Sequence, residues 1–485
     1  MGALDAADFK GSTGQLLELL AGAKPWCSHP SDRAESDSHA QRIEWEAVRP
    51  WPTLEPAALQ GLAGDVVRTL EPHTEADPAA VLLTFLVAFG NALGDRPHAR
   101  VGGARHPARL FACIVGETAR ARKGQSLADV RVILEAADPE WWNAAKESGL
   151  ASGEGIVKRF ADRDDGTPVE KRALFLEAEF ARTLVAAGRE TSTLSHLIRD
   201  AWDTGELRVL TRKDPLRATG AHAGVVAHIT LEELRARLVS AEIGSGFANR
   251  FLFTCARRSK KLPAGGNLSA VDLDALTAKV RDALATGRKR DAISRTPDAE
   301  RRWAELYNTL PEPPGLLGAI TARAEAQLLR LSLVYALLDG AHAIDVPHLL
   351  AALAVWRYAE ASAAHIFGGV LGSDTADRLL VELRAVYPDG LDREAQSALF
   401  HRNRAEAELE AARRQLEARG LAQRRSVPSD TGKGRPREVL CAVPPATKEP
   451  KETKKEAPAG SREAIPSSTS FPSSPDGNDW AEVEP

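Results

Sequence analysis

The sequence contains few cysteines, and no two of them have the close spacing of a metal site. Closely spaced cysteine pairs are typical of zinc sites, and dense sets of cysteines are typical of disulfide-rich secreted domains. Neither pattern occurs, which indicates a reducing compartment and a chain without disulfides. The four cysteines stand far apart, at Cys27, Cys113, Cys255 and Cys441.

Long hydrophobic runs and a secretory signal are also missing. The N-terminus has no basic stretch followed by an apolar one, which is the pattern of a signal peptide. The best apolar run, residues 81–89, is too short to span a bilayer and predicts a core helix instead. We therefore expect a cytoplasmic protein with no membrane partner.

Charge of one sign is not in excess, because 63 Lys and Arg residues stand against 67 Asp and Glu residues. Overall charge therefore neither indicates nor excludes a nucleic-acid partner, and only local basic clusters bear on that question. The 485 residues, of which 43% are hydrophobic, are enough for several domains with buried cores.

What the sequence does contain is an alternation of short apolar segments with segments of helical periodicity. Strands that alternate with helices predict an α/β fold with a mainly parallel sheet and helices on both faces. In such sheets, ligands bind beyond the carboxyl ends of the strands. The segments predicted as strands are 110–115, 172–180, 223–230 and 251–255.

Changes of composition divide the chain into predicted domains. After the α/β core, helical periodicity without strands predicts an all-helical module, with helices at 271–284, 298–310, 321–338 and 346–367. Three further helices and a β-hairpin then give the winged-helix pattern. The predicted domains are a flexible N-terminal arm (1–50), a helical lead-in (51–105), an α/β core (106–262), a helical lid (263–370), a winged-helix domain (374–443) and a disordered tail (444–485).

The loop at residues 116–126 is a candidate phosphate site. It joins a predicted strand to a predicted helix, an order that surrounds a phosphate with backbone N–H groups. The standard signature is Gly, four residues, then Gly-Lys-Ser/Thr. Here the lysine precedes the second glycine, and the alternative is a basic surface loop. The candidate nucleotide-binding residues are Gly116, Lys123, Gly124, Gln125 and Ser126, with the Ser126 hydroxyl on Mg²⁺.

Polar residues follow two of the other predicted strands. Glu177 and Glu179 come after an apolar run, and alternation predicts that both lie on one face, where they would position water or contact the metal. His228 and Thr230 end the third predicted strand and could sense the γ-phosphate. The alternatives are a solvated strand end for the two glutamates and an ordinary hydrogen-bonded histidine.

An arginine that neutralises charge developing on the phosphates is the remaining requirement of phosphoryl transfer. Arg250, just before the fourth predicted strand, could reach the phosphate of a neighbouring subunit. Arg323, near the start of a long predicted helix, has the same standing. The alternative for both is a surface salt bridge.

The predicted winged-helix domain carries the basic cluster that bears on DNA binding. Between Arg413 and Arg437 there are eight basic residues against two acidic ones. Because the presumed recognition helix begins with glutamates, contact between the wing and the DNA backbone is favoured over base reading. The alternative is a winged helix that contacts protein. The candidate DNA-binding residues are Arg424, Arg425, Lys433, Arg435 and Arg437.

Seven segments, in order, resemble a family of RecA-like P-loop ATPases of unknown-function designation. The family occurs in actinobacterial genomes, prophages and plasmids, often beside or fused to primase–polymerase domains. The resemblance covers roughly residues 50–443. The segments are VGETARARKGQS (115–126), GLASGEG (149–155), LEAEF (176–180), LIRDAWD (197–203), AHIT (227–230), GFANRF (246–251) and RLSLVYALLDG (330–340).

This resemblance implies an ATPase that uses ATP and Mg²⁺ and acts on DNA, as a helicase-like motor in replication of a phage, plasmid or integrated element. It also implies a homo-oligomer, by analogy a hexameric ring, and a separate primase, because residues 1–50 cannot hold a priming domain. The alternative is a DNA-binding initiator or regulator with a weak or degenerate nucleotide switch and no motor activity. Because the Lys123 loop departs from the standard signature, the choice between these two depends on whether the chain hydrolyses ATP.

Overall fold

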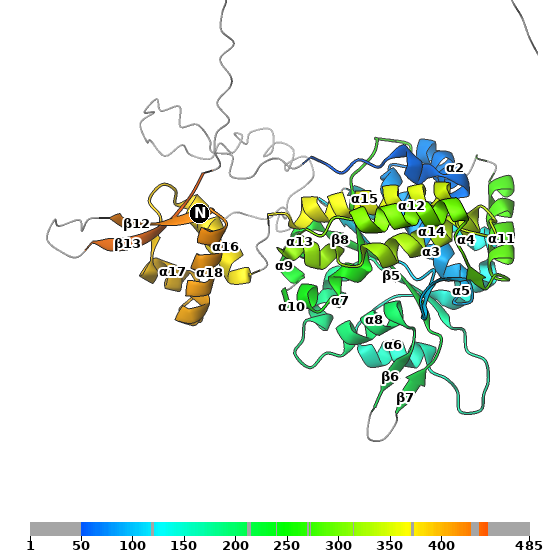
Figure 1. Cartoon of the computed structure of the whole chain (residues 1–485), viewed down its shortest axis with the longest axis horizontal. Helices are drawn as coiled ribbons and strands as arrows, with labels where there is room; N and C mark the ends of the chain where they lie inside the picture. The colour runs from blue at the N-terminus through cyan, green and yellow to red at the C-terminus, as the bar shows by residue number, and fades with distance from the viewer. Residues whose placement is uncertain are drawn as a thin grey trace, which may run out of the picture. The chain divides into compact units, whose positions relative to one another are not determined.

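The computed structural model describes residues 50–117, 121–210, 215–238, 240–268, 271, 273–313, 315–369, 373–427 and 436–444. The predicted N-terminal arm and C-terminal tail therefore lie almost entirely outside the described residues, as do Lys433 and Arg435. The described chain up to residue 369 is an α/β unit, and residues 373–444 have a hydrophobic cluster of their own (Figure 1).

A five-stranded sheet, parallel at every pairing, lies at the centre of the α/β unit. Its strand order is β4-β5-β8-β3-β9, so that β3 lies between two strands that come much later in the chain. The predicted parallel sheet is confirmed, and four of its five strands were predicted. The strands are β3 (Phe111–Gly116), β4 (Lys146–Glu147), β5 (Arg172–Glu177), β8 (His222–Thr230) and β9 (Phe251–Ala256).

Alternate residues of these strands contribute to two separate hydrophobic clusters, one on each face of the sheet. In β8, Val226 belongs to one cluster, whereas Val225 and Ala227 belong to the other. Helices supply most of the rest of both clusters, which confirms the prediction of helices on both faces. The helices from α4 to α10 are α4 (Lys123–Ala137), α5 (Pro139–Ala145), α6 (Gly153–Phe160), α7 (Phe180–Ala187), α8 (Leu194–Asp203), α9 (Leu231–Arg237) and α10 (Ser240–Gly244).

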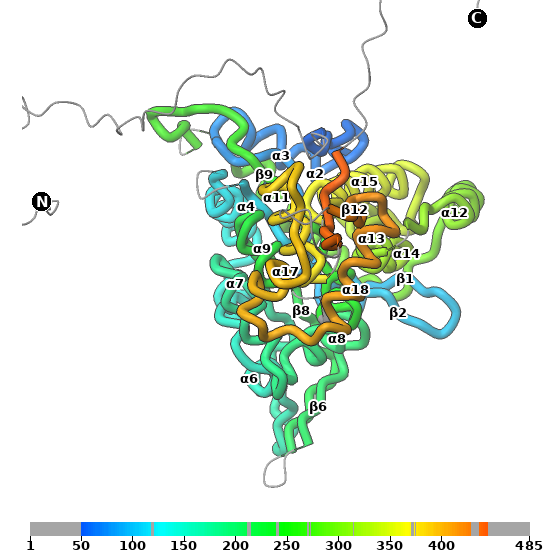
Figure 2. The backbone as a smooth tube through the Cα atoms, turned by 90° about the vertical axis from the view of Figure 1, so that its left-hand side faces the viewer, coloured from blue at the N-terminus to red at the C-terminus, as the bar shows by residue number. Residues whose placement is uncertain are grey.

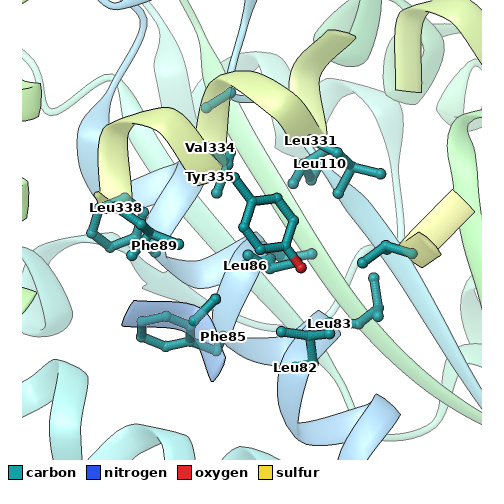
Figure 3. Packing of buried hydrophobic residues seen from close by; sticks show 14 of the residues in the cluster. Leu82, Leu83, Phe85, Leu86, Phe89, Leu110, Leu331, Val334, Tyr335 and Leu338 are labelled. Carbon is teal, nitrogen blue, oxygen red and sulfur yellow. The ribbon is translucent and has the colours of Figure 1, made fainter. Parts of the chain in front are cut away.

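Helix α3 (Pro78–Leu93) is the most deeply buried helix that packs on the sheet. Asp77 caps its first turn by accepting a hydrogen bond from Ala79 N, and the fifteen residues after Pro78 are all buried. Leucine and phenylalanine side chains of α3 pack against Tyr335 and its neighbours on α14 (Ala324–Leu338) (Figure 3). The run predicted as a core helix is therefore confirmed.

One polar side chain of α3 links the helix to the sheet. The amide nitrogen of Asn91 donates to the carbonyl oxygens of Ala173 (3.0 Å) and His222 (2.8 Å), at the beginnings of β5 and β8. The amide oxygen of Asn91 accepts a hydrogen bond from Trp141 Nε1 at 3.1 Å. Because every polar atom of this buried amide is satisfied, it also fixes how α3 sits across the two strands.

The helices predicted as a lid contribute to the same hydrophobic cluster as α2 (Gly61–Leu70) and α3. The four predicted helices are present, together with a short unpredicted one, α13. The helices of this region not yet named are α11 (Asp274–Gly287), α12 (Pro297–Thr309), α13 (Gly315–Thr321) and α15 (Val346–Phe367). Among the described residues, none of the helices has both the length and the apolarity required to cross a lipid bilayer.

Shorter elements complete the α/β unit. Two hairpins, neither of them predicted, extend from it (Figure 2). Strand β1 of the first hairpin also pairs with β10 (Ala292–Ile293), which lies between α11 and α12. This pairing connects the region of the predicted lid to the hairpin. The hairpins are β1 (His98–Val101) with β2 (Ala104–Pro107), and β6 (Leu207–Val209) with β7 (Leu216–Ala218); single helical turns are η2 (Pro56–Leu59), η3 (Glu71–His73) and η5 (Ala248–Arg250).

Residues 373–444 fold into three helices and a three-stranded antiparallel sheet of order β11-β13-β12. Their hydrophobic cluster combines leucines of α16 and α18 with residues of the two longer strands. The predicted helices and hairpin are found, and β11 is an addition to them. The elements are α16 (Asp374–Ala385), β11 (Leu391–Asp392), α17 (Arg393–Leu399), α18 (Glu406–Ala418), β12 (Ala422–Val427) and β13 (Arg437–Ala442).

Candidate functional site

Lys123 lies at the carboxyl edge of the central sheet, as its place after the first strand predicts. It is the first residue of α4, and its Nζ donates a hydrogen bond to the carbonyl oxygen of Ile229 on the neighbouring strand β8 (2.9 Å). Burial lowers the pKa of Lys123, and the carboxylate of Glu233 opposes that shift. The lysine therefore presents its positive charge beyond the ends of β3 and β8.

A glycine at the end of β3 allows the loop to return over the strand. A Cβ atom at Gly116 would lie 2.6 Å from Ala121 Cβ and 3.1 Å from Lys123 Cδ. Contacts this close exclude a side chain at this position unless the loop moves. Gly116, one of the candidate nucleotide-binding residues, is therefore needed for the close approach of the loop to the strand end.

The side chain of the residue before α4 does not cap the helix. Arg122 has a left-handed backbone (φ 56°), and within the described part of the chain no side chain accepts a hydrogen bond from the first turn, where Gln125 N donates to the carbonyl oxygen of Arg122 at 3.0 Å. Gly124 in that turn is exposed. Uncapped N–H groups at the start of a fifteen-residue helix favour an anion, and Lys123 adds a full positive charge beside them.

A buried carboxylate that sequence reasoning missed anchors this loop. Glu75 is ion-paired with Arg122 (2.8 Å) and with Arg258, and it accepts a hydrogen bond from Leu262 N (2.7 Å). The hydrogen bond from Arg258, with that from Leu262 N, lowers the pKa of Glu75 to about 2. Glu75 lies in the predicted helical lead-in, far from the loop in sequence, so no local pattern identifies it.

Ser126 does not take the position expected of an Mg²⁺ ligand. Its side chain is fully buried, and its Oγ donates to the carbonyl oxygen of Lys123 (2.8 Å) within the first turn of α4. With Lys123 as the first helical residue, the place of the hydroxyl residue in the standard signature falls on Gly124. The geometry therefore gives no support to a metal-binding role for Ser126. Gln125, which lies between Gly124 and Ser126, is partly buried.

Glu177 and Glu179 do not lie on one face, so this part of the prediction is wrong. Strand β5 ends at Glu177, and the chain turns before α7, so the alternation of a strand does not extend to Glu179. The side chain of Glu179 is 66% exposed and paired with Arg182 at 2.8 Å. Glu177 is buried, and its carboxylate accepts from Leu150 N (3.0 Å) and from Thr183 Oγ1 (3.4 Å).

His228 lies on β8, between the strand of the Lys123 loop and the strand of Glu177. It is buried, and its Nε2 has no hydrogen-bond partner among the described residues. Burial, and then the charge of Lys123, lowers the pKa of His228 to about 4. The imidazole is therefore neutral near pH 7, with one ring nitrogen as a hydrogen-bond donor and the other as an acceptor. Thr230 instead caps α9, where it forms a capping box with Glu233.

The sheet order sets the spacing between these groups. Strands β3 and β5 are separated by β8 alone, which corresponds to about 10 Å across two interstrand steps. In the register of the sheet, Ala227 lies beside Glu177 and His228 beside Ile114. Lys123, His228 and Glu177 therefore lie on or follow three adjacent strands.

Arg250 lies apart from this group, and its expected contact with the phosphate of a neighbouring subunit stays a prediction. It precedes β9, whose first residue pairs with Phe111 at the start of β3, so it lies at the amino edge of the sheet. The length of β9 separates it from the opposite edge by about 16 Å. Arg250 is buried and ion-paired with Asp203, and Arg323 pairs with the same carboxylate (3.3 Å). Both arginines form salt bridges, as the alternative predicts, but that of Arg250 is buried rather than on the surface.

The described arginines of the C-terminal hairpin differ in their partners. Arg424 pairs with Glu410 (2.7 Å) and Glu417 (2.9 Å) of α18 and is thus occupied within its own domain. Arg425 is exposed and donates to a backbone carbonyl, and Arg437 is exposed and lies 3.7 Å from Asp392. Arg425 and Arg437 line a surface hollow of about 690 Å³.

The glutamates at the start of α18 are also neutralised internally. Hydrogen bonds from Arg424, and then from Arg413, lower the pKa of Glu410 to about 2. Glu406 pairs with Arg413 at 2.6 Å. These contacts reduce the repulsion that the glutamates would otherwise exert on a DNA phosphate.

Within the described ranges, no group of three or more His, Cys, Asp or Glu side chains is placed to hold a metal ion. Comparison of the sequence with protein-family models finds no match, and comparison with curated proteins finds no significant match. The arrangement of Lys123, His228 and Glu177 at one sheet edge is therefore the main evidence for a function.

Proposed function

We propose that this chain has a RecA-like P-loop core that binds ATP at the carboxyl edge of its sheet, and that it acts on DNA as a helicase-like ATPase in replication of a mobile element. The observation that carries the proposal is the position of Lys123. Its Nζ is held beside the last residues of β8 by a backbone carbonyl, next to an uncapped helix N-terminus. Both features favour a phosphate group.

The triphosphate would replace the Ile229 carbonyl oxygen as the partner of Lys123 Nζ. A charged phosphate oxygen is a stronger acceptor than a carbonyl oxygen, so this exchange is favourable for a lysine that is partly desolvated. The N–H groups of the first turn of α4 would bind the same phosphates. Neutral His228, one strand away, could donate a hydrogen bond to an oxygen that gains charge.

Glu177 is the carboxylate best placed to orient an attacking water. It ends the strand on the far side of β8 and is shielded from bulk solvent. Mg²⁺ would supply charge neutralisation on the β- and γ-phosphates. Since Ser126 is occupied and Gly124 has no hydroxyl, the ion would be held mainly through the nucleotide and water, with Glu177 as a buried carboxylate at the end of β5.

A second candidate function is a DNA-binding regulator that binds nucleotide without turning it over. One observation favours it: the Ser126 hydroxyl is engaged by the helix backbone, and the Glu177 carboxylate is engaged by Leu150 N and Thr183 Oγ1. Both groups would have to exchange partners before they could assist hydrolysis. In this second candidate function the chain still binds phosphate at the Lys123 loop, but it does not move along DNA by hydrolysing ATP.

The C-terminal domain would serve either function as a winged helix. Its three helices and antiparallel hairpin support this assignment. Exposed Arg425 and Arg437, with Lys433 and Arg435 between them in the sequence, would contact DNA phosphates. Assembly as a ring and cooperation with a separate primase rest on the family resemblance alone. For Arg250 to act on a neighbouring subunit, it would have to leave its ion pair with Asp203.

The test is DNA-stimulated ATPase activity of the wild type and of the Lys123→Ala variant. Turnover that rises with DNA and falls at least about tenfold in the variant supports the ATPase. Nucleotide binding without turnover in the wild type supports the regulator. Equal turnover in both proteins would show that the site is elsewhere.

A further inference from the structure

The amino edge of the central sheet gathers four arginines. Arg109 precedes β3 and Arg250 precedes β9, while Arg323 and Arg330 come from the start and the middle of α14. Three of them are deeply buried: Arg109 is 2% exposed, Arg250 is 4% exposed and Arg330 is 1% exposed. Arginine is rarely buried to this degree without full pairing.

Trp202, at the end of α8, is the common neighbour of three of these guanidinium groups. The Cζ atom of Arg330 lies 3.6 Å from the centre of the indole ring. The Cζ atoms of Arg250 and Arg323 lie at 5.8 Å and 5.6 Å. Three guanidinium groups therefore lie near one buried indole ring. Cation–π attraction offsets only part of the repulsion between their charges.

The carboxylates at this edge do not balance the cations. Asp203 pairs with Arg250 and with Arg323, and Asp95 pairs with Arg109. Arg330 has no ion-pair partner among the described residues, and its Nη1 donates to the carbonyl oxygen of Arg109 at 2.9 Å. Four guanidinium groups thus face two carboxylates, an excess of two positive charges.

Neighbouring charges do not reverse this excess. Arg105 shares Asp95, and Arg199 lies close enough to lower the pKa of Arg250 after burial and Arg323 have done so. Glu206 is the one further carboxylate that acts on Arg109. Burial, and then the charge of Arg109, lowers the pKa of Arg330 well below its usual value, which shows that the protein alone stabilises this cation poorly.

Several buried N–H donors of the same cluster have no acceptor. They are the Nε groups of Arg109, Arg250 and Arg330 and the Nε1 group of Trp202, none of which has a hydrogen-bond partner among the described residues. Buried donors without acceptors are destabilising, and they are rare in folded proteins. An excess of donors together with an excess of positive charge is what an oxyanion site presents.

We propose that this arginine cluster, defined as Arg109, Arg250, Arg323, Arg330 and Trp202, binds a phosphate-type oxyanion. A phosphate dianion matches the two uncompensated charges and offers several acceptors to guanidinium donors. Access is through Arg323, whose side chain is 38% exposed, beside partly exposed Asp203. Free inorganic phosphate and the terminal phosphate of a nucleotide are the two sources of such a group.

This inference does not depend on the proposed function, because the arginine cluster and Lys123 lie at opposite edges of the sheet. A Lys123→Ala background removes phosphate binding at the loop from the measurement. In that background, isothermal titration calorimetry with inorganic phosphate, at constant ionic strength in chloride, should show one saturable site. Adding Arg323→Gln should weaken binding about tenfold or more.

Arg295→Gln is the matched control. Arg295 also lies over a tryptophan, 5.0 Å from the ring centre of Trp303, but it is paired with Glu300 at 2.6 Å. Phosphate affinity should be unchanged in that variant. No saturable binding in the folded protein, or equal weakening by both substitutions, would overturn the proposal.

The two sources are separated by titrating ADP in parallel. Tighter binding of ADP than of phosphate, lost with Arg323→Gln, identifies a nucleotide phosphate, whereas equal or weaker binding identifies free phosphate. If Arg323→Gln does not fold, Arg323→Lys keeps the charge without the two-pronged geometry and should still weaken binding measurably. Unchanged affinity in Arg323→Lys would then contradict the proposal.

Discussion

Replacing His228 by asparagine should make the protein more resistant to acid. His228 is 5% exposed, and burial followed by the charge of Lys123 lowers its pKa from 6.5 to about 4 in the folded state. Asparagine keeps much of the shape of the imidazole and cannot be protonated. The variant therefore removes the protonation of this group and little else.

The sign of the effect follows from which state binds the proton. Because the pKa is lower in the folded protein, the unfolded chain takes up the proton first as the pH falls below 6.5. Stability is thus lost between pH 6.5 and pH 4, and it is intact above that window. With these two pKa values, the loss at pH 5 is about 2 kcal/mol, and below pH 4 it approaches about 3 kcal/mol.

The assay is urea unfolding of the wild type and of His228→Asn near neutral pH and near pH 5. The wild type should lose about 2 kcal/mol more free energy of unfolding between the two conditions than the variant loses. His196→Asn is the control, because His196 is an exposed histidine whose side chain is 66% accessible. If wild type and His228→Asn lose equal stability, the histidine is not buried beside Lys123 as described.

Three other perturbations have clear outcomes. Asn91→Leu leaves two strand carbonyls and Trp141 Nε1 without partners, so thermal unfolding should show a loss of about 3 kcal/mol or more. Arg250→Met breaks a buried ion pair with Asp203 and should destabilise by about 3–5 kcal/mol. A loss below about 1 kcal/mol in urea unfolding would contradict a buried ion pair at this position. Replacing Arg425 and Arg437 by alanine should reduce the salt slope of DNA binding by about one unit each, and an unchanged slope would exclude them as phosphate contacts.

The parts of the fold that could be predicted are those in which a whole segment is buried. Strands β3 and β9 have every residue buried, so their apolar runs are visible in the sequence without reference to any other segment. The β1–β2 hairpin escaped prediction because its residues are mostly polar or exposed. Strand β4 escaped because two residues carry no periodicity.

The candidate site was predictable only where its residues follow a strand directly. Lys123 was correctly placed by the order of strand, loop and helix. Glu179 was misplaced because its direction depends on where β5 ends, and a turn after Glu177 is not marked by glycine or proline. The position of Arg250 before a strand indicates the amino edge of a parallel sheet, but its contacts with Trp202 and Asp203 could not be inferred from the sequence.

Residues whose partners are distant in sequence could not be inferred at all. Glu75 contacts Arg122 of the Lys123 loop although α3 lies between them in the sequence. No sequence motif around Glu75 indicates this contact. The arginine cluster is assembled around Trp202 from four segments of the chain. Each arginine on its own resembles an ordinary surface residue in the sequence.

The most direct test of the central claim is equilibrium binding of a fluorescent, non-hydrolysable ATP analogue to three proteins. They are the wild type, Lys123→Ala and Lys279→Ala, in which the replaced lysine is exposed and lies 3.9 Å from Asp65. A phosphate site at the start of α4 predicts that Lys123→Ala weakens binding about tenfold or more and that Lys279→Ala leaves it unchanged. Equal affinity in all three proteins would contradict a nucleotide site at this edge of the sheet.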